Sequence, residues 1–154
     1  MTEFQGGIPE ISMEGFQVVS GDLFSNYGHT KAPTCSLWPT SIGFGQVAIN
    51  TLNGCERIRI EINPSTKCLL AIPVTDKDKD FVRWTSGGKE PKARKIDCKY
   101  FTAELYKKWG LNPSMNYRAS GVLVSFNQQV MLMFDFNKAE SWYPKDKKAV
   151  NPVV

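Results

Sequence analysis

The sequence predicts a β-rich α+β fold in which two strand–helix–hairpin repeats pack as a pseudo-symmetric small barrel or sheet. The stretch from Ser41 to Pro73 contains a short strand, a short helix and a hairpin, and elements of the same kind follow in the same order between Ala93 and Asp135. Several of these strands alternate polar and apolar residues, which is typical of a sheet with one buried face. Small α+β domains all contain hairpins and short helices, so a coincidence of order is the alternative to internal duplication.

This organisation divides the 154-residue chain into five segments. They are an N-terminal arm, strand and loop (1–36), a first repeat (37–75), a linker (76–92), a second repeat (93–136) and a basic C-terminal tail (137–154). A domain of this size buries roughly 70% of the surface of its unfolded chain. We therefore expect it to fold without disulfide bonds or a bound metal ion.

The N-terminal segment carries little regular pattern. Residues 1–12 predict a flexible arm, and Gly15–Ser20 is a candidate first strand. Residues 24–36 predict a long polar loop that contains His29, the only histidine. A loop of this length in a small domain is either functional or mobile, so ligand contact by its aromatic residues and His29 stands beside the alternative of a disordered excursion.

The first repeat opens with a strand and a helix. Ser41–Phe44 predicts the strand, and Gly45–Leu52 has the spacing of a helix of about two turns. The residues on the apolar side of this helix are Val47, Ala48 and Leu52. Asn53-Gly54 ends the helix, because Asn and Gly tolerate the left-handed conformation of a helix C-terminus.

A hairpin and an edge strand follow. Arg57–Ile62 alternates charged residues with isoleucine, which predicts a strand with one buried face. After a turn at Asn63–Thr66, the apolar run Cys68–Ile72 predicts a central strand covered on both faces, with Leu70 in the core. In the linker, Phe81–Thr85 could add an edge strand.

The second repeat has the same order of elements. Lys95–Tyr100 predicts a strand, and Phe101–Trp109 predicts a helix whose apolar residues recur every fourth position. Gly110 ends that helix. The hairpin consists of Tyr117–Phe126, a turn at Asn127-Gln128 and Val130–Phe134.

The cysteines indicate a reducing compartment. The four are Cys35, Cys55, Cys68 and Cys98. They include no C-x-x-C pair, so no zinc site of the usual spacing is expected. Cys68 and Cys98 fall in predicted strands and are expected to be reduced core residues. Cys35 and Cys55 lie in loop-like sequence, where a disulfide between them is the alternative to free thiols.

Targeting and catalytic motifs are missing from the sequence. No apolar run approaches the roughly 20 residues of a membrane span, and the first residues lack the features of a signal peptide. Gly43-Phe44-Gly45 is too short for a dinucleotide fingerprint, and there is no P-loop, nucleophile elbow or H-E-x-x-H motif. We therefore expect a cytoplasmic protein that is not an enzyme, uses no cofactor and does not bind a membrane.

Charge points toward a polyanion as partner. The net charge is +4 and the isoelectric point is about 8.9, and a basic protein gains binding free energy when it displaces counterions from nucleic-acid phosphates. The positive charge is concentrated in the second half of the chain. The basic residues there are Lys92, Arg94, Lys95 and Lys99, with Lys107 and Lys108 on the following helix.

The element order resembles the swapped-hairpin architecture of the SpoVT/AbrB family, and its two-copy form is similar to the MraZ-like proteins. The matching stretches are Ser41–Ile49 with Arg57–Ile62, and Arg94–Phe101 with the later hairpin. Members of this family are DNA-binding transcription regulators whose basic residues near the first strand and helix of each copy meet the DNA. The resemblance implies double-stranded DNA as partner. The implied contacts are Arg57 and Arg59 in the first repeat and Lys92, Arg94, Lys95 and Lys99 in the second.

Two functions from different classes follow from the sequence. The first is a DNA-binding regulator or accessory factor that uses basic strand and helix faces. The second is a protein–protein interaction or assembly module, in which apolar hairpins such as Val130–Phe134 pair with a second copy or another protein. An origin in a phage or a mobile element is compatible with such a module, and the sequence does not decide it. Convergence of the basic residues on one face would favour the first, and exposed aromatic residues such as Trp142 and Tyr143 would favour the second.

Overall fold

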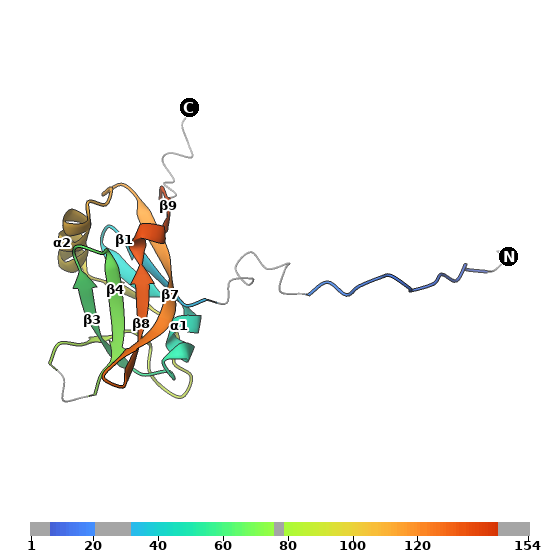
Figure 1. Cartoon of the computed structure of the whole chain (residues 1–154), viewed down its shortest axis with the longest axis horizontal. Helices are drawn as coiled ribbons and strands as arrows, with labels where there is room; N and C mark the ends of the chain where they lie inside the picture. The colour runs from blue at the N-terminus through green and yellow to red at the C-terminus, as the bar shows by residue number, and fades with distance from the viewer. Residues whose placement is uncertain (1–6, 21–31, 76–78, 145–154) are drawn as a thin grey trace, which may run out of the picture. The chain divides into compact units, whose positions relative to one another are not determined.

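In the computed structural model, the chain from Ala32 onward forms a β-rich unit built on one curled sheet, like half a barrel (Figure 1). The structure describes residues 7–20, 32–75 and 79–144. The chain divides into two units, Met1–Lys31 and Ala32–Val154. Figure 1 also labels the helices α1 and α2 in the second unit.

The first unit has no regular structure in its described residues. Residues 7–20 contain neither helix nor strand, and all of them are exposed. The prediction of a strand at Gly15–Ser20 is therefore wrong, because no described strand pairs with it. Of the predicted loop at 24–36, residues 24–31 with His29 lie outside the described residues.

Nine strands are found in the described part of the second unit. They are β1 (Thr34–Trp38), β2 (Ser41–Phe44), β3 (Arg57–Asn63), β4 (Cys68–Pro73), β5 (Val82–Arg83), β6 (Lys95–Asp97), β7 (Asn116–Phe126), β8 (Gln129–Asp135) and β9 (Glu140–Trp142). The helices are α1 (Gln46–Thr51), α2 (Lys99–Trp109) and the short 3-10 helix η2 (Phe136–Lys138). The order of the strands in the sheet is β5-β3-β4-β8-β7-β1-β2-β6, and β9 pairs with β7. All of these neighbouring strands run antiparallel to each other.

Both predicted series of elements are present. One is β2, α1, β3 and β4, and the other is β6, α2, β7 and β8. Equivalent strands pair with each other, β2 with β6 and β4 with β8. The helices differ in length, at 6 and 11 residues, and α2 begins at Lys99, so the strand predicted over Lys95–Tyr100 stops at Asp97. Duplication of one ancestral repeat stays a prediction.

β1 was not expected from the sequence. The predicted loop 24–36 ends inside this strand, because Cys35 and Leu37 point inward and are fully buried. All four cysteines have free thiols, so Cys35 and Cys55 form no disulfide. Burial raises the pKa of the Cys35 thiol well above its usual value, which keeps that group neutral.

The core lies on the inner face of the sheet, under α2. Its aromatic centre is formed by Phe44, which contacts the ring of Trp84 at 5.1 Å between centroids and that of Phe134 at 5.7 Å. α2 adds Leu105 and Trp109, both nearly inaccessible, and Gly110 ends it in the left-handed conformation (φ 65°). The helix and its stop are therefore confirmed as predicted.

β4 is a central strand, as predicted, but only one of its faces is fully covered. Leu69 and Ala71 point into the core with no exposed surface, whereas Leu70 is only half-buried on the opposite face. The prediction that Leu70 belongs to the core is wrong, because α2 and the core pack on the other side of the sheet. Val47 likewise lies on the exposed side of α1, with 36% of its surface accessible.

The curled sheet brings its two edge strands together. β5 and β6 are the ends of the strand order, yet Thr85, just after β5, forms a β-bridge with Ala93, just before β6. Thr85 is fully buried. This contact brings the β5 and β6 ends of the sheet side by side, near four of the eight predicted basic residues: Arg57, Arg59, Arg94 and Lys95.

Candidate nucleic-acid interface

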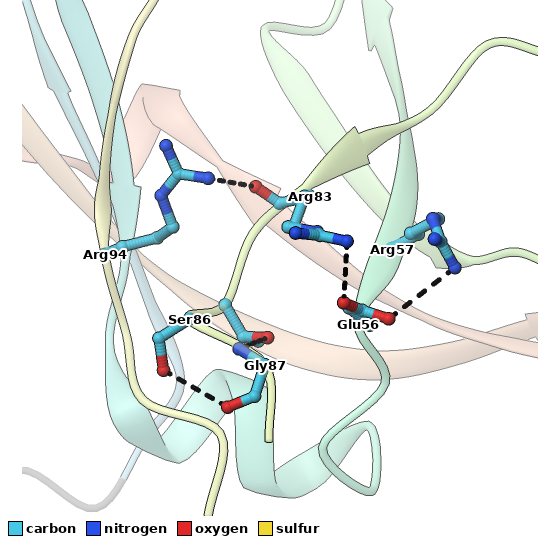
Figure 2. A network of polar contacts seen from close by, with 7 residues as sticks. Glu56, Arg57, Arg83, Ser86, Gly87 and Arg94 are labelled. Atoms are coloured by element: carbon cyan, nitrogen blue, oxygen red, sulfur yellow. Dashed lines mark hydrogen bonds and ion pairs between the residues drawn. The ribbon is translucent and has the colours of Figure 1, made fainter.

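Two arginines stand opposite each other on the outer face of β3 and β5. Arg57 and Arg83 are register partners, and the neighbouring pair of Ile58 and Val82 occupies the inner face. Like charges directly opposite in a sheet repel each other. The carboxylate of Glu56 offsets this repulsion, since its oxygens lie 3.0 Å from Arg83 Nη2 and 3.6 Å from Arg57 Nη1 (Figure 2).

A third arginine reaches the same place from the opposite edge of the sheet. Arg94 Nη1 donates a hydrogen bond to the backbone oxygen of Arg83 at 3.3 Å (Figure 2). The next residue, Lys95, begins β6. We call Arg57, Arg83, Arg94 and Lys95, together with Glu56, the basic seam; its four cations and one carboxylate leave an excess of three positive charges.

Aromatic rings lie against two of these cations. The guanidinium carbon of Arg57 is 5.2 Å from the ring centroid of Phe81, and Lys95 Nζ is 4.4 Å from that of Trp38. Such contacts contribute modestly at exposed sites. Here they orient the basic side chains along the outer face.

Trp38 can lie flat on the sheet because its neighbour is a glycine. Gly43 faces Lys95 across β2 and β6, and a Cβ atom at Gly43 would come within 3.1 Å of the Trp38 ring. A larger residue at position 43 would push the ring outward and away from its place beneath Lys95.

The remaining predicted residues are spread around the seam. Arg59 lies two positions along the outer face of β3, where its Nε pairs with Glu61 at 2.9 Å. Lys92 is exposed in the preceding loop, which is held by a hydrogen bond from the Lys92 backbone N–H to Ser86 Oγ.

Three further lysines belong to α2. Lys99, in the first turn, lies over the ring of Tyr100 at 5.4 Å. Lys107 and Lys108 lie in the last turn, where positive charge is favourable to the helix dipole. The structure thus brings Arg57 and Arg94 together around Arg83, with Lys95 next to Arg94 in the chain, and places the three predicted lysines of α2 on a separate element.

Sequence reasoning missed two cations on the outer face. Arg83 belongs to the basic seam because β5 pairs with β3, a pairing that the sequence does not show. The alternation of residues in Phe81–Thr85 could nevertheless have indicated that the Arg83 side chain points outward. Arg118, on β7, donates to Ser36 Oγ at 3.2 Å and lies 4.8 Å from the ring of Trp142. Because β9 holds Trp142 beside β7, this aromatic residue is only partly exposed.

Other kinds of site find less support in the described part of the chain. It contains no group of three or more His, Cys, Asp or Glu residues that could hold a metal ion. A hollow of about 350 Å³ on the outer face includes Leu70, Met133 and Glu61, but Glu61 is paired with Arg59. No helix among the described residues is long and apolar enough to span a membrane.

Comparisons with known proteins identify no protein similar to this chain. No family model matches it, and neither a curated protein nor a solved structure is significantly similar. The geometry of the basic seam is therefore the basis for a functional proposal.

Proposed function

We propose that the protein binds double-stranded DNA, without catalysing a reaction, and that the basic seam contacts the phosphate backbone. The observation that carries this proposal is the meeting of three arginines from separate segments: Arg57 and Arg83 share the carboxylate of Glu56. Arg94 joins them through a hydrogen bond to the backbone oxygen of Arg83. Guanidinium groups bind phosphate oxygens with two parallel hydrogen bonds. A cluster with excess positive charge on an outer sheet face supplies such contacts in several directions.

The rings beside the seam favour a duplex over a single strand. Proteins that bind single strands stack bases on open aromatic faces. Here Lys95 covers one face of Trp38, and Arg57 lies over Phe81. Phosphate contact leaves these pairs intact, whereas base stacking would have to displace the cations.

A regulator or accessory factor is the role that we propose for such binding. The pairing of β2 with β6 and of β4 with β8 supports the two-repeat arrangement on which the resemblance to SpoVT/AbrB and MraZ-like regulators was based. The four free thiols fit a reducing compartment, and we propose the cytoplasm.

The test is fluorescence anisotropy of labelled duplex DNA, single-stranded DNA and RNA, each at low and near-physiological salt. We expect duplex DNA to bind most tightly. Replacing Arg83 and Arg94 with Ala should reduce the slope of log K against log salt by roughly two units, since each lost phosphate contact contributes about 0.9.

The matched control replaces Lys107 and Lys108 with Ala. It removes the same amount of charge from α2, away from the seam, and should leave the slope nearly unchanged. Equal losses in both variants would assign binding to net charge alone. Absence of binding at low salt would remove the proposal.

A second candidate function, an assembly module, is favoured by a different observation. Within the predicted apolar hairpin, Leu132 and Phe134 are fully buried and cannot meet a partner. The tip of the same hairpin, however, exposes Val122, Phe126 and Val130.

A further inference from the structure

The hairpin of β7 and β8 extends past its neighbours in the sheet. The pairing of β7 with β1 ends at Ser120, followed by one hydrogen bond from Gly121 N–H to Pro33 O at 2.8 Å. The pairing of β8 with β4 ends at Leu132. Within the described part of the chain, the tip between Val122 and Met131 therefore pairs only with itself.

This tip is apolar and exposed. Val122 is 57% exposed, Leu123 54%, Phe126 72% and Val130 48%. No charged residue occurs between Arg118 and Asp135. Sheet edges that stay in solvent are usually protected by charged residues, proline or a covering segment, and this edge has no such charge or proline.

The direction of the backbone groups shows which edge is open. In an antiparallel strand, the N–H and C=O of one residue point to the same side, and alternate residues point the same way. Because Gly121 N–H points toward β1, the groups of Leu123 and Ser125 point toward the open edge of β7. No residue that the structure describes forms a hydrogen bond with these groups.

We propose that a second copy of the chain pairs with this edge, β7 against β7 in antiparallel orientation, about a two-fold axis at Val124. Leu123 would then exchange both backbone hydrogen bonds with the partner's Ser125, and Ser125 with the partner's Leu123. Val124 would face the partner's Val124, in the closer spacing of a pair without hydrogen bonds. An axis at Leu123 is disfavoured, because it would need Gly121 N–H, which already donates to Pro33.

A second copy fits this edge because the edge is complementary to itself. Val122 lies opposite the partner's Phe126, and all the side chains that meet on this face are apolar. Each copy has a net charge of +4, so most surfaces of two copies repel each other, whereas the uncharged tip does not. A two-fold contact of this kind uses the same patch on both subunits and closes without forming a fibre.

The experiment is a measurement of mass in solution, by sedimentation equilibrium, for the full chain and two variants. We expect the unaltered protein to have twice its 17.3 kDa chain mass. Val124→Lys places two ammonium groups opposite each other at the axis and should give monomers. Val130→Lys, on the other strand of the same tip, should leave the dimer intact.

Three results would overturn the proposal. The first is an unaltered protein that is monomeric at all accessible concentrations, and the second is a Val124→Lys variant that is still dimeric. The third is a Val130→Lys variant that folds but is no longer a dimer, because this would indicate general apolar contact instead of edge pairing. A heterologous protein that binds a monomeric chain at this tip would assign the edge to a different partner.

A second variant keeps the proposal testable if Val124→Lys does not fold. Val124→Cys should form a disulfide-linked dimer on mild oxidation, because facing residues of a pair without hydrogen bonds have the spacing that a disulfide needs. Val130→Cys and the unaltered protein, with its four free thiols, are the controls. Cross-linking no greater than theirs would contradict pairing at Val124.

Discussion

Gly121 allows β7 to lie directly against an aromatic side chain of the core. A Cβ atom at this position would come within 2.8 Å of Phe134 Cδ1 and closer still to Cε1. Phe134 has no exposed surface and packs against Phe44, so its ring has little room to move.

We expect Gly121→Ala to lower the free energy of unfolding by about 1 to 3 kcal/mol, as overpacking of a core does. Urea denaturation measures the change. Ser120→Ala, at the exposed neighbouring position, should stay within about 0.5 kcal/mol. Equal stability of Gly121→Ala and the unaltered protein would show that the strand or the ring shifts freely.

Tyr106 joins α2 to the sheet through its hydroxyl group. The hydroxyl lies 2.8 Å from Met115 O and 3.3 Å from Leu37 O. Burial raises the pKa of this phenol, and the nearby Tyr117 adds to the effect. A raised pKa in the folded state means that folding is favoured below the unfolded value of about 10 and loses this contribution as the pH rises above it.

We therefore expect the free energy of unfolding to fall as the pH rises above about 10. The fall should be smaller in Tyr106→Phe, which has no phenol to ionise at this position. At neutral pH the same variant should be less stable by about 1 to 3 kcal/mol, because two carbonyl groups lose a donor. Thermal unfolding over a pH series measures both effects. Tyr100→Phe is the control, since Tyr100 is 81% exposed; an alkaline profile identical in both variants would contradict the assignment.

At the scale of elements, the turn between β7 and β8 uses two residues that are not glycine in a left-handed conformation. Asn127 has φ 50° and Gln128 has φ 66°. Two-residue hairpin turns of this kind favour Asn followed by Gly, because a side chain in this conformation is strained.

Gln128→Gly should stabilise the protein by up to about 1 kcal/mol. Glycine relieves the backbone strain at this position, but it also gives the unfolded chain more conformational freedom, which offsets part of the gain. Chemical denaturation measures the gain. Gln129→Gly, one residue later and inside β8, should instead destabilise it. A loss of stability in Gln128→Gly would mean that the Gln side chain contributes more than its backbone strain costs.

Local patterns were enough to predict most of the elements. Arg57–Ile62 alternates so regularly that its strand and its buried face follow directly, and Gly110 marks the end of α2. β1 could not be predicted, because its five residues follow a proline and include only two large inward side chains. Its stability comes from pairing with β2 and β7 on either side, which sequence patterns do not contain.

At the scale of the whole molecule, the candidate site depends on register. The sequence indicated Arg57 and Arg94 as cations but could not indicate that a curled sheet brings them together around Arg83. Arg83 enters the site only because β5 pairs with β3 at that position. A shift of one residue would turn Arg83 toward the core and Val82 outward.

The shared carboxylate of Glu56 makes stability and binding respond in opposite directions. Glu56→Gln removes the negative charge between Arg57 and Arg83. We expect it to lower stability by up to about 1 kcal/mol, because both ion pairs are partly exposed, and to strengthen DNA binding, because one repulsive charge is lost.

Calorimetric unfolding and DNA titration in the same buffer measure the two effects, and added salt should diminish both. Glu61→Gln is the control, because among the ion pairs of the described residues it affects the pair with Arg59 alone. Weaker DNA binding by Glu56→Gln would show that Glu56 positions the arginines for phosphate and does not merely balance their charge.

The central place of β8 has a consequence for synthesis of the protein. β8 lies between β4 and β7, and no other strand in the described part of the chain pairs with both of them (Figure 1). Until residues 129–135 leave the ribosome, the two groups of strands can pair, among the described residues, only through the bridge between Thr85 and Ala93, and the edges of β4 and β7 that pair with β8 stay open. Pairings so distant in sequence form slowly, so we expect the newly made chain to be most vulnerable to aggregation, and most in need of a chaperone, immediately before β8 is available.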